Sequence, residues 1–110
     1  MKLSAEPEQT ISTVDSGCAD NFNLEDFYAA GHMVTLFGER NPNHQFSDAA
    51  LAARLLASRQ VGRDCLHSAR VGRMMHERGL AEEVDFAAQN DVFDVVPRFS
   101  EGRLRAVTVA

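Results

Sequence analysis

The sequence predicts an α+β domain, because helical and strand patterns occupy separate parts of the chain. Three observations carry this prediction. Residues 47–59 are rich in alanine and leucine, residues 68–89 show capped helical periodicity, and residues 92–109 are dominated by β-branched and aromatic side chains. We expect a small mixed or antiparallel sheet, made of an N-terminal strand and a C-terminal hairpin and covered by three or four helices.

The composition is that of one globular domain. The chain has 110 residues, of which 45% are hydrophobic and 25% charged, so it can build one core but not two complete domains. With a formal net charge of −5 we expect no nucleic-acid partner, because phosphate binding needs a basic face. No window is apolar enough for a membrane span, and the opening residues lack the apolar run of a signal peptide. We therefore expect a cytoplasmic protein with no membrane partner.

The first elements follow from β-forming and capping residues. Residues 1–9 are polar and predict a flexible N-terminus, and the single domain spans residues 10–110. Residues 10–17 predict a strand, because Ile11, Thr13 and Val14 favour extended backbone.

Two helices are expected next. Asn23 is the expected N-cap of a helix that ends near Phe37, and Ser47 is the expected N-cap of a second helix. The second helix stops near Arg59 or continues through Gly62 to His67, and the sequence does not decide between these two C-terminal ends.

The second half predicts two further helices and a hairpin. Ser68 is the expected N-cap of a helix that stops at Gly79, a residue that can adopt the left-handed conformation. Residues 80–89 predict another short helix with acidic residues near its positive end. A strand begins at Val92 and ends at Pro97, and residues 104–109 form its hairpin partner after a turn.

Two groups of residues have chemistry that suits a ligand. Carboxylates cluster in and after the last helix, where they suit a hard cation such as Mg²⁺ or a solvated helix start: Glu82, Glu83, Asp85, Asp91 and Asp94. Arg70, Gly72 and Arg73 lie in a first helical turn, where arginine forks and free amides suit a phosphate or sulfonate. An exposed turn with a packing glycine is the alternative. The four histidines show no metal-type spacing, and neither do Cys18 and Cys65.

Two blocks of residues carry a resemblance to a known family. The block near the C-terminus contains Gly72-Arg73, Gly79, Phe86, Gln89, Asp91, residues 93–97 and Gly102-Arg103. The block nearer the N-terminus contains Gly17, Phe22, residues 24–26 and Ala30-Gly31. In both blocks the chain resembles the C-terminal half of the magnesium-dependent 2-phosphosulfolactate phosphatases. The resemblance covers nearly the whole chain from Ile11, but only about half of the family's protein.

This resemblance implies hydrolysis of a phosphate ester at a site between two α+β halves, of which the N-terminal half is missing. It implies roles for eight residues: Glu25 or Asp26 as acid or base, Gly17, Arg70, Gly72 and Arg73 in substrate binding, and Glu83 and Asp91 as Mg²⁺ ligands. The expected partner is a complementary N-terminal half or a second copy of the chain.

Several positions depart from the family's pattern. Ala69 and Val71 replace serines that flank the arginine, and Glu83 replaces an aspartate. Loss of two hydroxyls removes donors to a phosphate, and a longer carboxylate displaces a metal ligand. A non-catalytic domain that kept the fold and binds a small anion or another protein is therefore the alternative to a phosphatase component.

Overall fold

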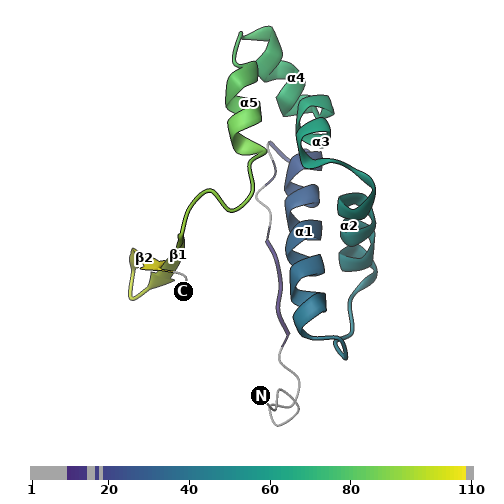
Figure 1. The fold of residues 1–110 in the computed structure, drawn as a ribbon, viewed down its shortest axis with the longest axis vertical. Helices are drawn as coiled ribbons and strands as arrows, with labels where there is room; N and C mark the ends of the chain where they lie inside the picture. The colour runs from purple at the N-terminus through teal and green to yellow at the C-terminus, as the bar shows by residue number, and fades with distance from the viewer. Residues whose placement is uncertain (1–9, 15–16, 18, 109–110) are drawn as a thin grey trace.

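The structure, a computed structural model, describes residues 10–14, 17 and 19–108 (Figure 1). Over these residues it has five helices and one antiparallel hairpin, which confirms the α+β class. The elements are α1 (Leu24–Arg40), α2 (Asp48–Arg59), α3 (Gly62–Ser68), α4 (Arg70–Glu77), α5 (Ala81–Ala87), β1 (Val95–Ser100) and β2 (Arg103–Thr108). Among the described helices, none has the length and apolar character needed to cross a membrane.

Helices α1 and α2 pack against each other through small residues (Figure 1). Ala30, Gly31 and Ala53 are buried, and a Cβ atom added at Gly31 would lie 1.9 Å from the carbonyl oxygen of Ala53. The absence of a side chain at Gly31 thus allows the two backbones to touch. The cap of α2 is confirmed, because the amide of Ala50 donates to Ser47 Oγ at 3.1 Å.

Helix α1 runs past its predicted end at Phe37 to Arg40. Gly38 lies inside the helix, and the Asn41 side-chain amide donates to the carbonyl oxygen of Phe37 at 3.0 Å. A helical glycine costs only about 1 kcal/mol relative to alanine, so Gly38 does not stop the helix.

Helices α3, α4 and α5 form a second group beyond the N-terminal end of α1 (Figure 1). Helix α2 ends at Arg59, and α3 begins at Gly62 as a separate helix and not as a continuation of α2. The prediction of Ser68 as an N-cap was wrong. Ser68 is the last residue of α3, its hydroxyl donates back to the carbonyl oxygen of Cys65 at 3.0 Å, and Ala69 occupies the N-cap position of α4.

The stop of α4 at Gly79 is confirmed, with φ of +72°. The terminal hairpin is also confirmed, although β1 begins at Val95 and not at Val92. Pro97 pairs with Ala106 in the middle of β1 and does not end the strand. A two-stranded ribbon has an open edge on each strand, so a residue without an amide proton is tolerated there.

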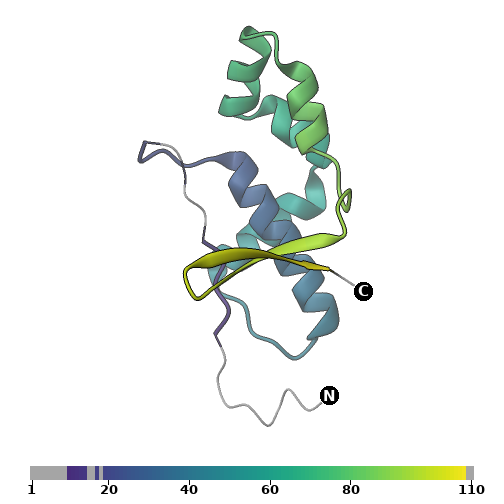
Figure 2. The same cartoon turned by 90° about the vertical axis from the view of Figure 1, so that its left-hand side faces the viewer.

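The predicted N-terminal strand was wrong for the described residues. Residues 10–14 and 17 form no strand, and residues 10–13 instead line a hollow beside α1. Residues 15–16 of that prediction, and the predicted flexible N-terminus, lie outside the described residues. Within the described part of the chain, the sheet therefore contains only β1 and β2. Their residues are exposed along the whole length of both strands, and the helices do not cover the sheet (Figures 1 and 2).

Candidate functional site

Three polar side chains meet where α4 begins beside the start of α1. Arg70, the first residue of α4, donates from Nη2 to Asn23 Oδ1 at 2.8 Å. Asn23 in turn donates from Nδ2 to Asp26 Oδ2 at 3.3 Å. Asn23 therefore links two residues that the sequence assigned to one site, the anion-binding Arg70 and the acid or base Asp26. We name Asn23, Asp26 and Arg70 the arginine cluster.

Two further predicted substrate-binding residues, Gly72 and Arg73, lie beside Arg70 on α4 and have different structural roles. Arg73 is exposed, and its Nη1 donates to the carbonyl oxygen of Ser68 at 2.6 Å, which satisfies a free carbonyl at the end of α3. Gly72 is buried, and a Cβ atom there would lie 1.9 Å from the carbonyl oxygen of Leu66. Gly72 thus lets α4 approach the backbone of α3, while the two arginines face solvent.

The other two predicted residues near this end lie close in sequence to the arginine cluster. Glu25 is half-buried in the first turn of α1. Gly17 has φ of +63°, and a Cβ atom there would lie 2.9 Å from the carbonyl oxygen of Asn21, so a glycine suits this turn.

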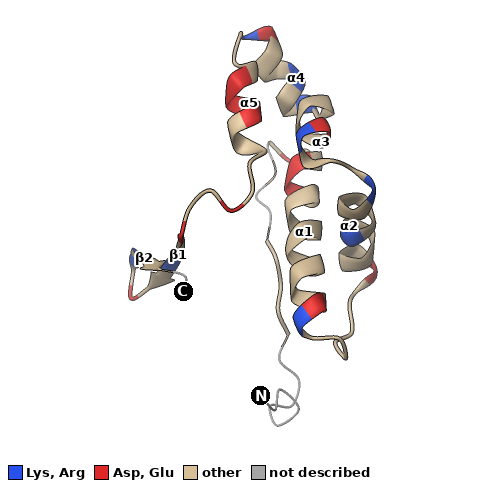
Figure 3. Cartoon of the chain, viewed as in Figure 1, with Lys and Arg blue, Asp and Glu red and all other residues tan. Residues whose placement is uncertain are grey.

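The two predicted metal ligands lie at the start of α5 and in the loop after it. Glu83 is exposed in its first turn, and Asp91 is exposed beyond its last residue, with φ of +55°. A helix of this length is about 10 Å long. Within residues 10–14, 17 and 19–108, no three His, Cys, Asp or Glu side chains converge as a metal-ligand set. The described part of this chain therefore does not hold a complete magnesium site, although it offers individual carboxylates on α5 and on the loop after it (Figure 3).

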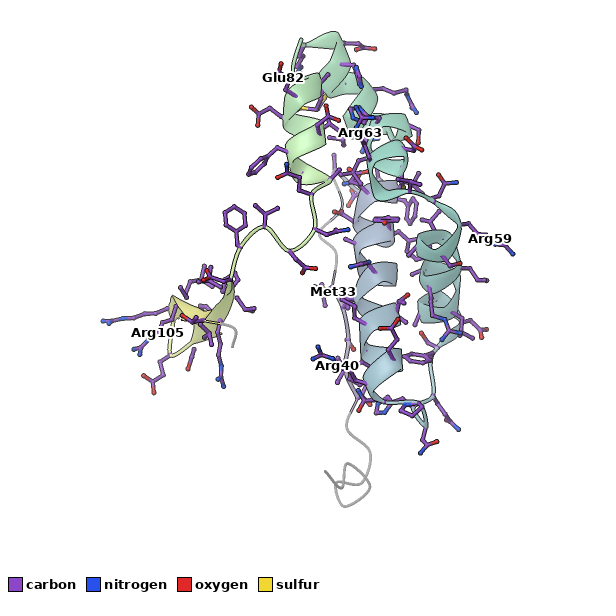
Figure 4. The ribbon with its side chains drawn as sticks, in the orientation of Figure 1. Met33, Arg40, Arg59, Arg63, Glu82 and Arg105 are labelled. Carbon is purple, nitrogen blue, oxygen red and sulfur yellow. The ribbon has the colours of Figure 1, made fainter. Side chains whose placement is uncertain are left out.

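A second polar cluster joins α3, α4 and α5, and the sequence did not predict it. Asp85 Oδ1 accepts from Arg63 Nε at 2.7 Å and from His67 Nε2 at 2.6 Å. The other ring nitrogen of His67, Nδ1, lies 2.7 Å from Nε2 of His76. Arg63 lies on α3, the helix next to α5 (Figure 4). We name Arg63, His67, His76 and Asp85 the histidine cluster.

One sequence signal pointed toward the histidine cluster. Arg63 and His67 are four residues apart, which places them on one face of a helix once α3 is assigned. The partners Asp85 and His76 come from other helices, and only the packing of α3, α4 and α5 brings them together.

The surroundings shift two acid groups in opposite directions. The hydrogen bond from His67, with that from Arg63, holds the pKa of the Asp85 carboxyl below its ordinary value. Burial, with a smaller effect of the nearby Glu25 charge, raises the pKa of the Cys65 thiol. Asp85 is therefore held as a carboxylate, and Cys65 as an unreactive thiol.

An apolar hollow of about 630 Å³ lies between residues 10–13, α1 and the start of α2, and its lining includes no residue of either cluster. Phe27, Met33 and Phe46 contribute to its lining, and Figure 4 shows Met33 on the side of α1 that faces the N-terminal segment. The hollow would suit an apolar group, whereas the two polar clusters carry charged side chains that suit an ionic ligand.

A model of the 2-phosphosulpholactate phosphatase family matches residues 1–102. The chain belongs to this family. The match covers both polar clusters, all five helices and β1, so membership of the 2-phosphosulpholactate phosphatase family applies to the elements that build the candidate site.

Curated relatives agree with this assignment. One from Carboxydothermus hydrogenoformans is 33% identical over 96 residues, one from Symbiobacterium thermophilum is 29% identical over 99, and one from Clostridium beijerinckii is 22% identical over 99. Each is named "Probable 2-phosphosulfolactate phosphatase". The matches cover 86–88% of this chain but only 40–42% of the relatives. No solved structure matches the chain significantly.

Proposed function

We propose that this chain is one half of a 2-phosphosulfolactate phosphatase, which hydrolyses its phosphate ester only when the remaining part of the family's sequence, or a second copy, completes the site. The observation that carries the proposal is the combination of a family match over residues 1–102 with coverage of about two fifths of the relatives. The missing three fifths would be supplied within the same polypeptide or by a separate one.

The arginine cluster supports the role of an anion-binding half. A guanidinium has five N–H donors, and Arg70 shares one nitrogen with Asn23, which leaves donors for a phosphate or sulfonate. Arg73 lies three residues further along α4, so both arginines present positive charge near one end of the helix. Asp26, linked through Asn23, is the group that we assign as acid or base, with Glu25 as its neighbour. Gly17 and Gly72 allow close backbone contacts, with Asn21 and Leu66 respectively, in the segments that lead to the arginine cluster.

The exposed hairpin of β1 and β2 supports the proposal that a complementary half packs against this chain. A two-stranded ribbon alone is marginally stable, and a third strand or a packed helix usually stabilises it. Phe99 and Leu104 face each other in register, and their exposed fractions are 71% and 73%. We assign the complementary half as the element that covers them, because exposed apolar patches mark interaction sites.

In this proposal a Mg²⁺ ion is bound jointly by this chain and by the complementary half. In phosphoryl-transfer sites Mg²⁺ is commonly held by one or two carboxylates, with water and substrate phosphate completing its shell. Glu83 lies in the first turn of α5 and Asp91 lies in the loop after it, so each would serve as a single ligand beside groups from the other half. The described residues do not fit a complete site.

A non-catalytic role in binding a small anion or a protein is the second candidate. It is favoured by Ala69 and Val71, which flank Arg70 without a hydroxyl group. Under this alternative Arg70 still binds an anion, but no phosphate is released.

The test is a complementation assay. The chain is mixed with the N-terminal three fifths of the Carboxydothermus hydrogenoformans relative, and phosphate release from 2-phosphosulfolactate is measured with Mg²⁺ and with a chelator. We expect release from the mixture and none from either half alone. A stable complex that releases no phosphate would contradict the phosphatase proposal and leave the non-catalytic role, and size-exclusion chromatography of the chain alone would detect a homodimer.

A further inference from the structure

The two histidines of the histidine cluster have the arrangement of a pair of metal ligands. Asp85 accepts from the Nε2–H group of His67 at 2.6 Å, so in the neutral ring Nδ1 carries a free lone pair. That lone pair points toward Nε2 of His76, only 2.7 Å away. Two ring nitrogens bound to one tetrahedral zinc ion lie about 3.3 Å apart, since each Zn–N bond is about 2 Å long, so the two rings need to separate by only about 0.6 Å to bind the ion.

The carboxylate behind His67 is the second observation. Histidines that bind metals almost always donate their other ring N–H to a carboxylate, a carbonyl or a water, which fixes the ring and raises its basicity. Asp85 provides this contact. Arg63 binds the same carboxylate oxygen at 2.7 Å, so its charge is balanced by Asp85 and does not face the ring nitrogens unopposed.

We propose that His67 Nδ1 and His76 Nε2 form a binding site for a divalent transition-metal ion of the zinc class, which bridges α3 and α4. Imidazole nitrogens suit zinc, nickel and copper, whereas magnesium prefers oxygen ligands, so this site is separate from the carboxylates assigned to Mg²⁺. The ion displaces the hydrogen bond between the rings, and His76 moves its proton from Nε2 to Nδ1, so that each ring presents a lone pair.

The protein supplies two ligands, and the site is open on one side. His76 is exposed and His67 is half-buried, so water completes the coordination. Among the described residues, no third His, Cys, Asp or Glu side chain joins the two histidines as a ligand. The only residue between α3 and α4 is Ala69, which is buried, so the ion would fix the angle of a short connection.

The experiment is a calorimetric titration of Zn²⁺ into the full chain, free of any affinity tag, in a buffer that does not bind metals. A Cys18→Ser background leaves Cys65 as the single thiol of the chain. We expect one saturable ion per chain. His76→Gln should weaken binding at least about tenfold, and Asp85→Asn by about tenfold, the usual range for a lost outer contact.

A control variant makes the test specific. His44→Gln changes an exposed histidine that packs against Phe37, outside the histidine cluster. It should bind Zn²⁺ as the parent does, with helix content checked by circular dichroism. No saturable binding, or equal affinity in the His76→Gln variant, would overturn the proposal. The result does not depend on phosphatase activity.

Discussion

The guanidinium of Arg70 donates to the side-chain oxygen of Asn23 at 2.8 Å, which joins the start of α4 to the start of α1 across 47 positions of sequence. Asn23 is also the N-cap residue of α1, although its side chain makes no capping bond to the helix backbone. Its oxygen and its amide are instead used by Arg70 and Asp26. Asn23 therefore holds Arg70, which we assign to anion binding, near Asp26, which we assign as acid or base.

Asn23→Ala should loosen the contact between α1 and α4. A hydrogen bond of this kind contributes about 1 kcal/mol, so we expect the free energy of unfolding to fall by roughly that amount. Urea denaturation measures the change. Asn43→Ala, in the exposed loop after α1, is the control and should leave stability unchanged. Equal stability of both variants would argue against a contribution from the Asn23 contacts.

Gly31→Ala should destabilise the pair α1 and α2 strongly. The new Cβ would lie 1.9 Å from a backbone oxygen of Ala53, so the helices must separate, at a cost of about 2 kcal/mol or more. Gly38→Ala is the matched substitution in the same helix, because its nearest neighbour is the end of the Phe46 side chain at 3.2 Å. We expect that variant to be neutral or more stable, since alanine favours the helix. Thermal unfolding would compare them, and similar losses would contradict the packing described for Gly31.

The Asp85 carboxylate should contribute to stability at neutral pH and lose that contribution in acid. Its pKa is lowered in the folded protein relative to an unfolded value near 3.9, so the stabilisation is present above about pH 4 and disappears as pH falls through the folded value. Urea midpoints measured from pH 6 to pH 3 should therefore fall less in Asp85→Asn than in the parent. Asp94→Asn, in the exposed segment before β1, serves as control. A parallel decline in the parent and Asp85→Asn would refute the linkage.

Cys65 should react slowly with alkylating reagents while the protein is folded. Its exposed fraction is 1%, and burial raises the pKa of the thiol, so little thiolate reaches the reagent. In a Cys18→Ser background, iodoacetamide at pH 8 should modify Cys65 at least roughly tenfold more slowly than in urea. Mass spectrometry follows the reaction, and equal rates in the two solvents would show that the side chain is accessible.

Local signals predicted the elements that local chemistry decides. Ser47 and the alanine-rich run after it fix α2, and Gly79 ends α4 because a residue without Cβ is suited to that backbone angle. The predicted N-terminal strand is absent from residues 10–14 and 17, because β-forming residues such as Ile11 do not form a strand without a partner in register.

The contacts within the two polar clusters could not be predicted from sequence, because they join residues that are far apart in the chain. His67 and Asp85 are 18 residues apart, and their contact depends on how three short helices pack. The sequence named Arg70 and Asp26 for one site on the basis of family resemblance, but it gave Asn23 only a capping role, and the contact between Asn23 and Arg70 needed the fold.

The most direct measurement of the central claim is the steady-state kinetics of Arg70→Ala in the completed phosphatase, compared with Arg59→Ala at the exposed end of α2 (Figure 4). If Arg70 binds the anionic substrate, its removal should lower kcat/KM at least about tenfold, mainly through a higher KM, because a charged hydrogen bond is lost. Arg59→Ala should match the parent. An Arg70→Ala enzyme with parental KM and kcat would contradict the assignment of the arginine cluster as the anion site.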